Sequence, residues 1–254
     1  MINATGASLV EGQSVLSGQT VVVIGGSAGI GFETARRARA EGANVILSGR
    51  DAGRIERAGL ELGALGTSAF DATDWASLTQ FFRSLPEPVD HVMVTAGSSY
   101  YAKVADIDVS QVRRAFDEHL VLVLEVARAS IGKVRPGGTL LFMTGTDARR
   151  PGIGQSVAAI LAAALPALTA NLALELAPIR VNLIAAGFVD TGLSASLLGD
   201  DLEKRRSQLR ATLPVRRVVE PEDVAALALQ LMGNTALTGG TYDIDGGQQI
   251  VPRT

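Results

Sequence analysis

The stretch 20–31 constrains the fold of this chain more than any other, because a short apolar run leads directly into spaced glycines. Residues 20–24 are apolar or β-branched throughout, which favours a strand buried on both faces of a parallel sheet. Three glycines follow, Gly25, Gly29 and Gly31, ahead of a helical pattern over 30–41. Glycines let backbone N–H groups approach a phosphate closely, and the helix dipole favours its negative charge. The stretch predicts either a dinucleotide cradle or an ordinary tight turn.

Apolar runs and helical patterns alternate along the rest of the chain. The expected strands cover 20–24, 44–48, 66–70, 89–95, 139–144, 179–185 and 240–244, and the expected helices cover 30–41, 51–62, 74–84, 108–132, 153–177 and 222–232. Short connections between such elements are typical of βαβ units. We therefore predict an α/β fold: a single-domain, Rossmann-type, doubly wound parallel sheet of about seven strands with helices on both faces. Its ligand crevice should lie at the carboxyl ends of the strands.

Length and composition narrow the classes of function. The 254 residues suffice for one α/β domain, so we expect a dinucleotide-binding domain over 19–254, after a disordered or surface-lying N-terminal arm, 1–18. A net charge of −3 argues against nucleic acid or a membrane as a partner. The arm has no Lys, no Arg and no long apolar block, which argues against a signal peptide. Cysteine is absent and no cluster of metal ligands is visible, so we expect no metal and a cytoplasmic protein acting on a small molecule.

Short motifs are spread over nearly the whole chain. They are Gly25-Gly-Ser-Ala-Gly-Ile-Gly31, Asp71, Ala96-Gly97, Glu175-Leu-Ala-Pro-Ile-Arg-Val-Asn182, Gly187-x-x-x-Thr191, Pro221-Glu-Asp-Val-Ala225 and Thr238-Gly-x-x-x-x-x-Asp245-Gly-Gly247. Together they resemble the short-chain dehydrogenase/reductase family. The resemblance implies that a nicotinamide dinucleotide contacts Gly25, Ser27, Gly29, Ile30, Gly31, Asp71, Ala72, Ala96, Gly97, Gly187, Val189 and Thr191. Two residues depart from the pattern, since Thr95 replaces the usual Asn and Ala186 the usual Pro.

The end of the second expected strand favours NADP(H) over NAD(H) as the cofactor. About twenty residues past the glycines, where an acid would hold the ribose 2′-hydroxyl of NAD, the chain has Ser48-Gly49-Arg50. Arg50 can hold a 2′-phosphate through charge-assisted hydrogen bonds worth about 1.5–3 kcal/mol. We expect the carboxylate of Asp51 to cap the next helix instead of meeting the ribose. The alternative is that Arg50 is a solvated surface charge.

The four catalytic residues implied by the resemblance are absent. In the family a Tyr exchanges the proton, a Lys four residues later lowers its pKa, a Ser orients the substrate oxygen, and an Asn holds a water relay. Counting from Glu175 places the Tyr and Lys positions at Ala158 and Ala162, and the Ser and Asn positions fall on Gly145 and His119. Tyr occurs only at 100, 101 and 242 and Lys only at 103, 133 and 204, so no alignment restores a Tyr-x-x-x-Lys pair.

A few side chains remain as candidates for substitute catalytic groups. His119 is of the type that exchanges protons near neutral pH. Tyr101, with Tyr100, can lean over the crevice, and Thr146, with Thr144 and Asp147, can hold a substrate oxygen. Each of these has a structural alternative, as a core histidine or as plain lining. The segment 188–217, with Lys204-Arg-Arg206 and Arg210, falls where the family has its substrate lid.

Two functions fit these residues. The first is an NADP(H)-dependent oxidoreductase that acts on a carbonyl, a hydroxyl or an activated alkene with non-standard catalytic groups. The second is a catalytically silent dinucleotide-binding sensor or assembly partner. The resemblance and the small residues of 157–176 also predict a homodimer or homotetramer packed through the helices of the second half.

Overall fold

The computed structural model describes residues 15–251, and within them a sheet of parallel strands runs in the order β3-β2-β1-β4-β5-β6-β7. The strands are β1 (Thr20–Ile24), β2 (Asn44–Gly49), β3 (Gly66–Ala69), β4 (Val89–Val94), β5 (Val134–Gly145), β6 (Arg180–Ala186) and β7 (Thr241–Ile244). Every pair of neighbours is parallel. The strand order reverses between β1 and β4, which makes that junction the expected place for a ligand. The predicted fold class is confirmed.

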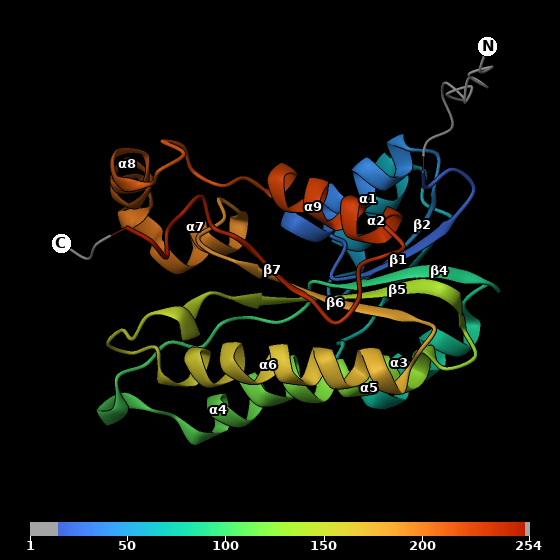
Figure 1. Cartoon of the computed structure of the whole chain (residues 1–254), viewed down its shortest axis with the longest axis horizontal. Helices are drawn as coiled ribbons and strands as arrows, with labels where there is room; N and C mark the ends of the chain where they lie inside the picture. The colour runs from blue at the N-terminus through green and yellow to red at the C-terminus, as the bar shows by residue number, and fades with distance from the viewer. Residues whose placement is uncertain (1–14, 252–254) are drawn as a thin grey trace, which may run out of the picture.

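Helices cover both faces of this sheet (Figure 1). Above it lie α1 (Gly29–Ala40), α2 (Ala52–Leu62) and α9 (Pro221–Gly233), and below it lie α3 (Trp75–Ser84), α4 (Val109–Phe116), α5 (Leu122–Ser130) and α6 (Ser156–Glu175). Two further helices, α7 (Gly192–Leu198) and α8 (Leu202–Thr212), lie beyond the carboxyl ends of the strands. Both helices belong to the segment 188–217, where the sequence predicts a lid. They close one side of the crevice.

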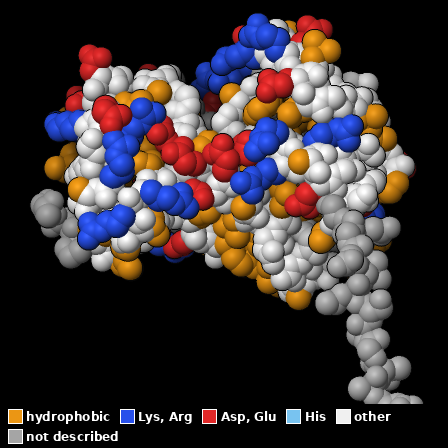
Figure 2. Space-filling model, turned by 90° about the horizontal axis from the view of Figure 1, so that it is seen from above, with side chains coloured by type: hydrophobic (Ala, Val, Ile, Leu, Met, Phe, Trp, Pro, Cys, Tyr) orange, Lys and Arg blue, Asp and Glu red, His pale blue; other side chains and the backbone are white. Residues whose placement is uncertain are grey.

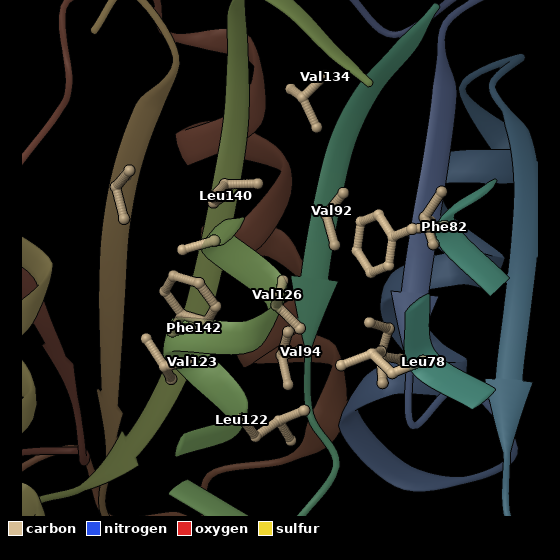
Figure 3. Close-up of a cluster of buried hydrophobic side chains, with 14 of the residues drawn as sticks. Leu78, Phe82, Val92, Val94, Leu122, Val123, Val126, Val134, Leu140 and Phe142 are labelled. Atoms are coloured by element: carbon tan, nitrogen blue, oxygen red, sulfur yellow. The ribbon is translucent and has the colours of Figure 1, made fainter. Parts of the chain in front are cut away.

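The two faces of each strand belong to two hydrophobic cores. In β1, Val22 and Ile24 pack on the side of α3 and α5, whereas Val21 and Val23 pack on the side of α1 and α9. Figure 3 shows the lower core, where Val92 and Val94 of β4 meet Phe82 of α3 and Val126 of α5. Because successive strand residues point to opposite faces, a strand buried on both faces is mostly apolar, and its polar residues need partners inside the protein.

A buried arginine fixes the last helix and the last strand to β6. Arg180 donates to the carbonyls at the carboxyl end of α9, among them Leu231 O at 2.8 Å and Met232 O at 2.6 Å, which the helix itself cannot satisfy. Asn182, two residues on, donates to Leu237 O at 2.9 Å and accepts from Gly240 N at 3.2 Å. The motif 175–182 therefore has a structural role.

Two elements differ from the sequence expectation. The helix expected over 108–132 is divided by a π-helical turn, Asp117–Val121, between α4 and α5. Strand β5 begins at Val134 and not at 139, because Val134 pairs with Val89 before the register shifts. A π turn changes the direction in which side chains leave a helix and is common at functional sites. Here it carries Glu118 and His119.

Only the end of the expected N-terminal arm is described, because residues 1–14 lie outside the described residues, as do 252–254. Residues 15–18 form a turn that is joined to the domain. Leu16 is fully buried, and Gly18 N donates to Gly42 O at 2.9 Å. This part of the arm therefore belongs to the core of the fold.

Candidate active site

The glycine loop packs so closely against the end of β4 that side chains have no room there. A Cβ on Gly31 would collide with Gly25 O and Thr95 Oγ1, and a Cβ on Gly25 would lie 2.6 Å from Ala96 N. Thr95, at the position of the usual Asn, donates its hydroxyl hydrogen to Gly25 O at 3.1 Å. The threonine thus fastens the loop to the crevice floor, which is a physical reason for glycine at 25 and 31.

The start of α1 offers free backbone donors. Its N-cap residue, Ala28, makes no side-chain capping bond, and the first turn has no acidic residue. The first N–H groups of a helix lack partners inside the helix, so they are available to an anion. Gly29 has a positive φ of 56°, and a Cβ there would stand 3.6 Å from Thr191 Cγ2. The cradle therefore fits a pyrophosphate, and it extends from β1 to the loop after β6.

Arg50 lies exposed at the end of β2, beside the glycine loop. A Cβ on Gly49 would stand 3.4 Å from the Ser27 side chain, so the two loops approach each other closely. Asp51 caps α2 as predicted, because its carboxylate accepts from Arg54 N at 2.8 Å, and that bond lowers its pKa. These contacts place Arg50 directly after the close approach of the two loops, and they turn the neighbouring carboxylate toward α2.

Asp71 follows β3 on the same edge of the sheet. Its carboxylate accepts from Thr73 N at 2.9 Å, which lowers its pKa, and the nearby charges of Arg50 and Arg114 lower it further. Ala72 beside it is buried. The side chains predicted for the adenosine end of a dinucleotide, Asp71 and Arg50, therefore lie near each other.

Glu118, which the sequence does not single out, holds the loop after β4. Its carboxylate accepts from Ser98 N and Ser98 Oγ, each at 2.9 Å, and from Arg114 Nε at 2.7 Å. Burial alone would raise the pKa of Glu118, but these hydrogen bonds keep it below its ordinary value. Glu118 lies in the π turn, and its buried carboxylate fixes the loop at Ser98, directly after Ala96-Gly97.

A cavity of about 350 Å³ opens at the carboxyl ends of β4, β5 and β6, beside the start of α1. Its lining includes the predicted cofactor residues Ile30, Ala96, Gly97, Gly187, Val189 and Thr191, together with the predicted catalytic residues Tyr101, His119 and Thr146. Thr191 also begins α7, because its hydroxyl accepts from Ser194 N at 3.2 Å. Predicted residues from five distant stretches of sequence thus border one cavity.

The positions where the family has its Ser, Tyr and Lys are small. Gly145 ends β5, and Ala158 and Ala162 are buried on one face of α6, 7% and 6% exposed. Residues four apart on a helix share a face, so the two alanines form an apolar wall. Neither alanine lines the cavity. A group that exchanges protons in this cavity would therefore have to come from other residues.

Asp147 takes the place of the missing side chain at Gly145. A Cβ on Gly145 would collide with Asp147 Oδ2, so only glycine lets the carboxylate lie there. The other oxygen, Oδ1, accepts a hydrogen bond from the Tyr101 hydroxyl at 3.3 Å. Both side chains line the cavity. The two residues come from the loops after β4 and β5, which meet at the crevice.

Burial changes the acidity of this pair. It raises the pKa of Asp147 above its ordinary value of 3.8, although the hydrogen bond from Tyr101 acts to lower that pKa. Although Tyr101 is 46% exposed as a residue, burial and then the charge of Asp147 raise the pKa of its hydroxyl. The phenol therefore keeps its proton, and the carboxyl group takes up a proton more readily than an exposed aspartate does.

The other catalytic candidates are held in different ways. His119 Nδ1 donates to Ala115 O at 3.0 Å, which leaves Nε2 on the cavity side, close to Gly97. Thr146 is buried, and its hydroxyl accepts from Gln249 Nε2 at 2.6 Å. Tyr100 instead packs among α4 and α6 residues, and its hydroxyl accepts from Asp108 N at 2.9 Å. Of the two adjacent tyrosines, only Tyr101 lines the cavity.

A second, more polar cavity of about 280 Å³ adjoins the first, between the 146–155 loop and α8. The two share Thr146, Asp147, Gln155, Arg205 and Gln248 in their linings. Figure 2 shows positive and negative side chains interspersed over the α7–α8 part of the surface. The second cavity extends the crevice toward α8 and the residues that follow it.

Two features bear on other classes of function. Within residues 15–251, no three His, Asp or Glu side chains are grouped in a way that could hold a metal ion. Helix α6 has the length and mean hydropathy, 2.0, of a membrane span. Its Leu161, Leu165 and Leu172 are nevertheless buried in the protein, as in a helix that covers a sheet.

Comparison with known proteins identifies the family of this chain. A family model described as enoyl-(acyl carrier protein) reductase matches residues 24–249. A short-chain dehydrogenase/reductase named ATR9, from Stachybotrys chlorohalonatus, is 30% identical over 252 residues, which cover 91% of this chain and 97% of that protein.

Solved structures agree in fold. The MalC reductase/Diels-Alderase of Malbranchea aurantiaca superposes with a TM-score of 0.86 at 24% identity, covering 94% of this chain and 99% of that one. A small-chain dehydrogenase in complex with NADPH superposes with a TM-score of 0.79 at 29% identity, covering 92% and 100%. With this match over most of its length, the chain belongs to the short-chain dehydrogenase/reductase family, whose members bind a nicotinamide dinucleotide.

Proposed function

We propose that this protein is an NADP(H)-dependent oxidoreductase that acts on a carbonyl or hydroxyl group, or on an activated alkene, of a small molecule. The observation that carries the proposal is the carboxyl group of Asp147, which lies beside Gly145 in a cavity bordered by the nicotinamide-side residues. A protein that only sensed a dinucleotide would have no use for an acid at that point. In this account the site retains proton chemistry after the loss of the family's tyrosine.

The choice of NADP(H) is supported by the charge at the end of β2. Arg50 is exposed beside Gly49 and Ser27, and the carboxylate of Asp51 is engaged by Arg54 N. Charge-assisted hydrogen bonds to a 2′-phosphate would favour NADP(H) over NAD(H) by about 10- to 150-fold. A structural relative in complex with NADPH is consistent with this choice.

Asp147 would act as the proton-exchanging group. A bound NADPH would provide the hydride for the carbonyl carbon of the substrate. The carbonyl oxygen takes a proton from Oδ2 of protonated Asp147, and solvent returns that proton through the open side of the cavity. In the reverse direction the carboxylate accepts the proton of the substrate hydroxyl. Its raised pKa makes the protonated form available at a higher pH than for an exposed aspartate.

Tyr101 would be the positioning residue of this pair. Its hydroxyl donates to Oδ1, which leaves Oδ2 directed to the side of Gly145. Since its own pKa is raised, the phenol remains a donor throughout the neutral range. His119 Nε2, on the opposite wall, can accept a proton from solvent or substrate, and Thr144 and Thr146 can offer a hydroxyl to the substrate oxygen.

The test is oxidation of NADPH over a broad panel of ketones, aldehydes and enones, with NADPH affinity measured separately by protein fluorescence. Asp147→Asn should lower turnover by about 10²–10⁴ and leave NADPH affinity unchanged. Asp200→Asn is the matched control, because this exposed acid lies in the lid segment and lines neither cavity. Tight NADPH binding without turnover on any compound would favour the silent dinucleotide-binding protein instead.

Assembly into a homodimer or homotetramer is part of the proposal. Leu124 of α5 and Ile160 and Leu174 of α6 are 48%, 53% and 81% exposed, which leaves apolar side chains on the outer side of this layer. Light scattering at micromolar concentration should give a dimer or larger species, and a monomer would refute this part. The cytoplasmic location expected from the sequence stays a prediction.

A further inference from the structure

Arg205 of α8 stands at the boundary between the two cavities and lines both. Its guanidinium carbon lies 5.9 Å from the centre of the Phe188 ring, so the aromatic face supports the cation from one side. Arg205 Nη1 donates to Gln208 Oε1 at 2.9 Å. The side chain is partly buried, and that burial lowers its pKa.

Arg205 differs from the other arginines of α8, which form ion pairs with carboxylates. Arg206 forms a two-bond ion pair with Asp190, at 2.6 and 2.8 Å, and Arg210 pairs with Glu203. Arg150, the other cation of the second cavity, donates to Gln248 O at 2.9 Å and to Val251 O. Among the residues that the structure describes, no carboxylate lies within ion-pairing distance, 4.0 Å, of the Arg205 guanidinium.

A partly buried cation without a counter-ion is costly, because burial disfavours its charge. A ligand anion would remove that cost and would use the N–H groups that Gln208 leaves free. The planar guanidinium matches a carboxylate in a two-bond geometry. Asp147 also lines both cavities, and in its ionised form it would repel a doubly charged phosphate more strongly than a singly charged carboxylate.

We infer that Arg205 binds a carboxylate of the substrate, so that the natural substrate is an oxo acid or a related hydroxy or unsaturated acid. The reacting group lies in the first cavity near Asp147, and the carboxylate lies at the junction with the second. This inference rests on the proposed oxidoreductase function for the identity of the reacting group. The carboxylate preference itself is a property of binding and is measured without turnover.

The test compares matched acids and esters. Benzoyl-substituted propionate, butyrate and valerate, and the methyl ester of each, are titrated calorimetrically into the protein in the presence of NADPH. The chain lengths vary the distance from ketone to carboxylate. At least one acid should bind about 10-fold or more tightly than its ester. Arg205→Gln should abolish that preference, and Arg205→Lys, which keeps the charge but loses the planar fork, should retain part of it.

Lys204→Gln is the matched control, because it removes one positive charge from the adjacent, exposed position that lines neither cavity. It should leave the preference unchanged. The inference is overturned if acids and esters bind the wild type equally, if no acid binds, if Arg205→Gln keeps the preference, or if Lys204→Gln loses it. A protein that prefers the acids but never oxidises NADPH would support Arg205 and refute the proposed function, so the two failures are distinguishable.

Discussion

At the β1–β2 side of the crevice, backbone atoms approach so closely that glycine is required, whereas at the β5–α6 side alanines stand where the family has long polar side chains. Gly25 and Gly31 are fixed by contacts with Thr95 and with each other. Ala158 and Ala162 make an apolar wall, and an acid from the next loop occupies the space beside Gly145. The glycine loop keeps the pattern that the sequence shares with the family, whereas the positions aligned with the family's Tyr and Lys do not.

This difference separates the part of the mechanism that depends on the whole fold from the part that depends on one side chain. Holding two reactants together can contribute about 7–11 kcal/mol, and this contribution depends on the cradle and the shape of the crevice. General acid–base help is typically worth about 10²–10⁴ in rate, and it depends on a single well-placed group. One proton-exchanging side chain can therefore replace another, as we propose for Asp147, while the cradle stays intact.

The largest effect should come from filling the cradle. In Gly31→Ala the new methyl group would meet Gly25 O and Thr95 Oγ1, so the loop must shift and lose its geometry for phosphate. We expect NADPH to bind about 100-fold more weakly or not at all, as measured by fluorescence titration with thermal unfolding run alongside. Gly66→Ala should bind normally, since a Cβ there meets no atom within 4 Å. Unchanged affinity in Gly31→Ala would contradict the close-packed cradle.

A smaller, selective effect should follow from removing the charge beside the cradle. Arg50→Gln should weaken NADPH binding by about 10- to 150-fold and leave NADH binding unchanged, because only NADPH carries the 2′-phosphate. Arg54→Gln provides the control, since that exposed cation lies one turn further along α2, beside Asp51. Equal losses for both dinucleotides in Arg50→Gln would remove the argument for NADP(H).

The last expected effect concerns the stability of the fold and not binding, and it lies in strand β4. His91 is buried, and its Nε2–H donates to Gln19 Oε1 at 2.6 Å. Burial lowers the pKa of His91 from 6.5 to about 4. Between these values the unfolded chain binds a proton that the folded chain does not, so stability falls as pH falls through this window. The loss is about 3 kcal/mol in full.

Urea unfolding at pH 7 and at pH 4.5 measures this dependence. His91→Gln should remove most of it, leaving the slope contributed by the other groups of the protein. A variant whose stability still falls as steeply as that of the wild type would show that another group is responsible. The result separates the pH dependence of the fold from that of the site, because protonation of Asp147 should favour reduction while protonation of His91 disfavours folding.

Local rules predicted the strands and the cap that follows β2. The continuous apolar runs predict the strands, and Asp51 after β2 is a helix cap by its residue type and position. The catalytic side depends on contacts that no local rule contains. Tyr101 and Asp147 lie 46 positions apart, and the orientation of Glu118 depends on a π turn within an apparently regular helix. The sequence does not show which of the two adjacent arginines is ion-paired, and in the structure Asp190 pairs with Arg206 and not with Arg205.

The central claim is that Asp147 supplies the proton that the family's tyrosine supplies elsewhere. It is tested most directly by the pH profile of NADPH oxidation, in wild type and Asp147→Asn, on the best ketone from the panel. The account predicts that the wild-type rate falls as pH rises above the raised pKa of Asp147, and that the slower variant loses this dependence. Identical pH profiles, or an equal rate in the variant, would contradict it.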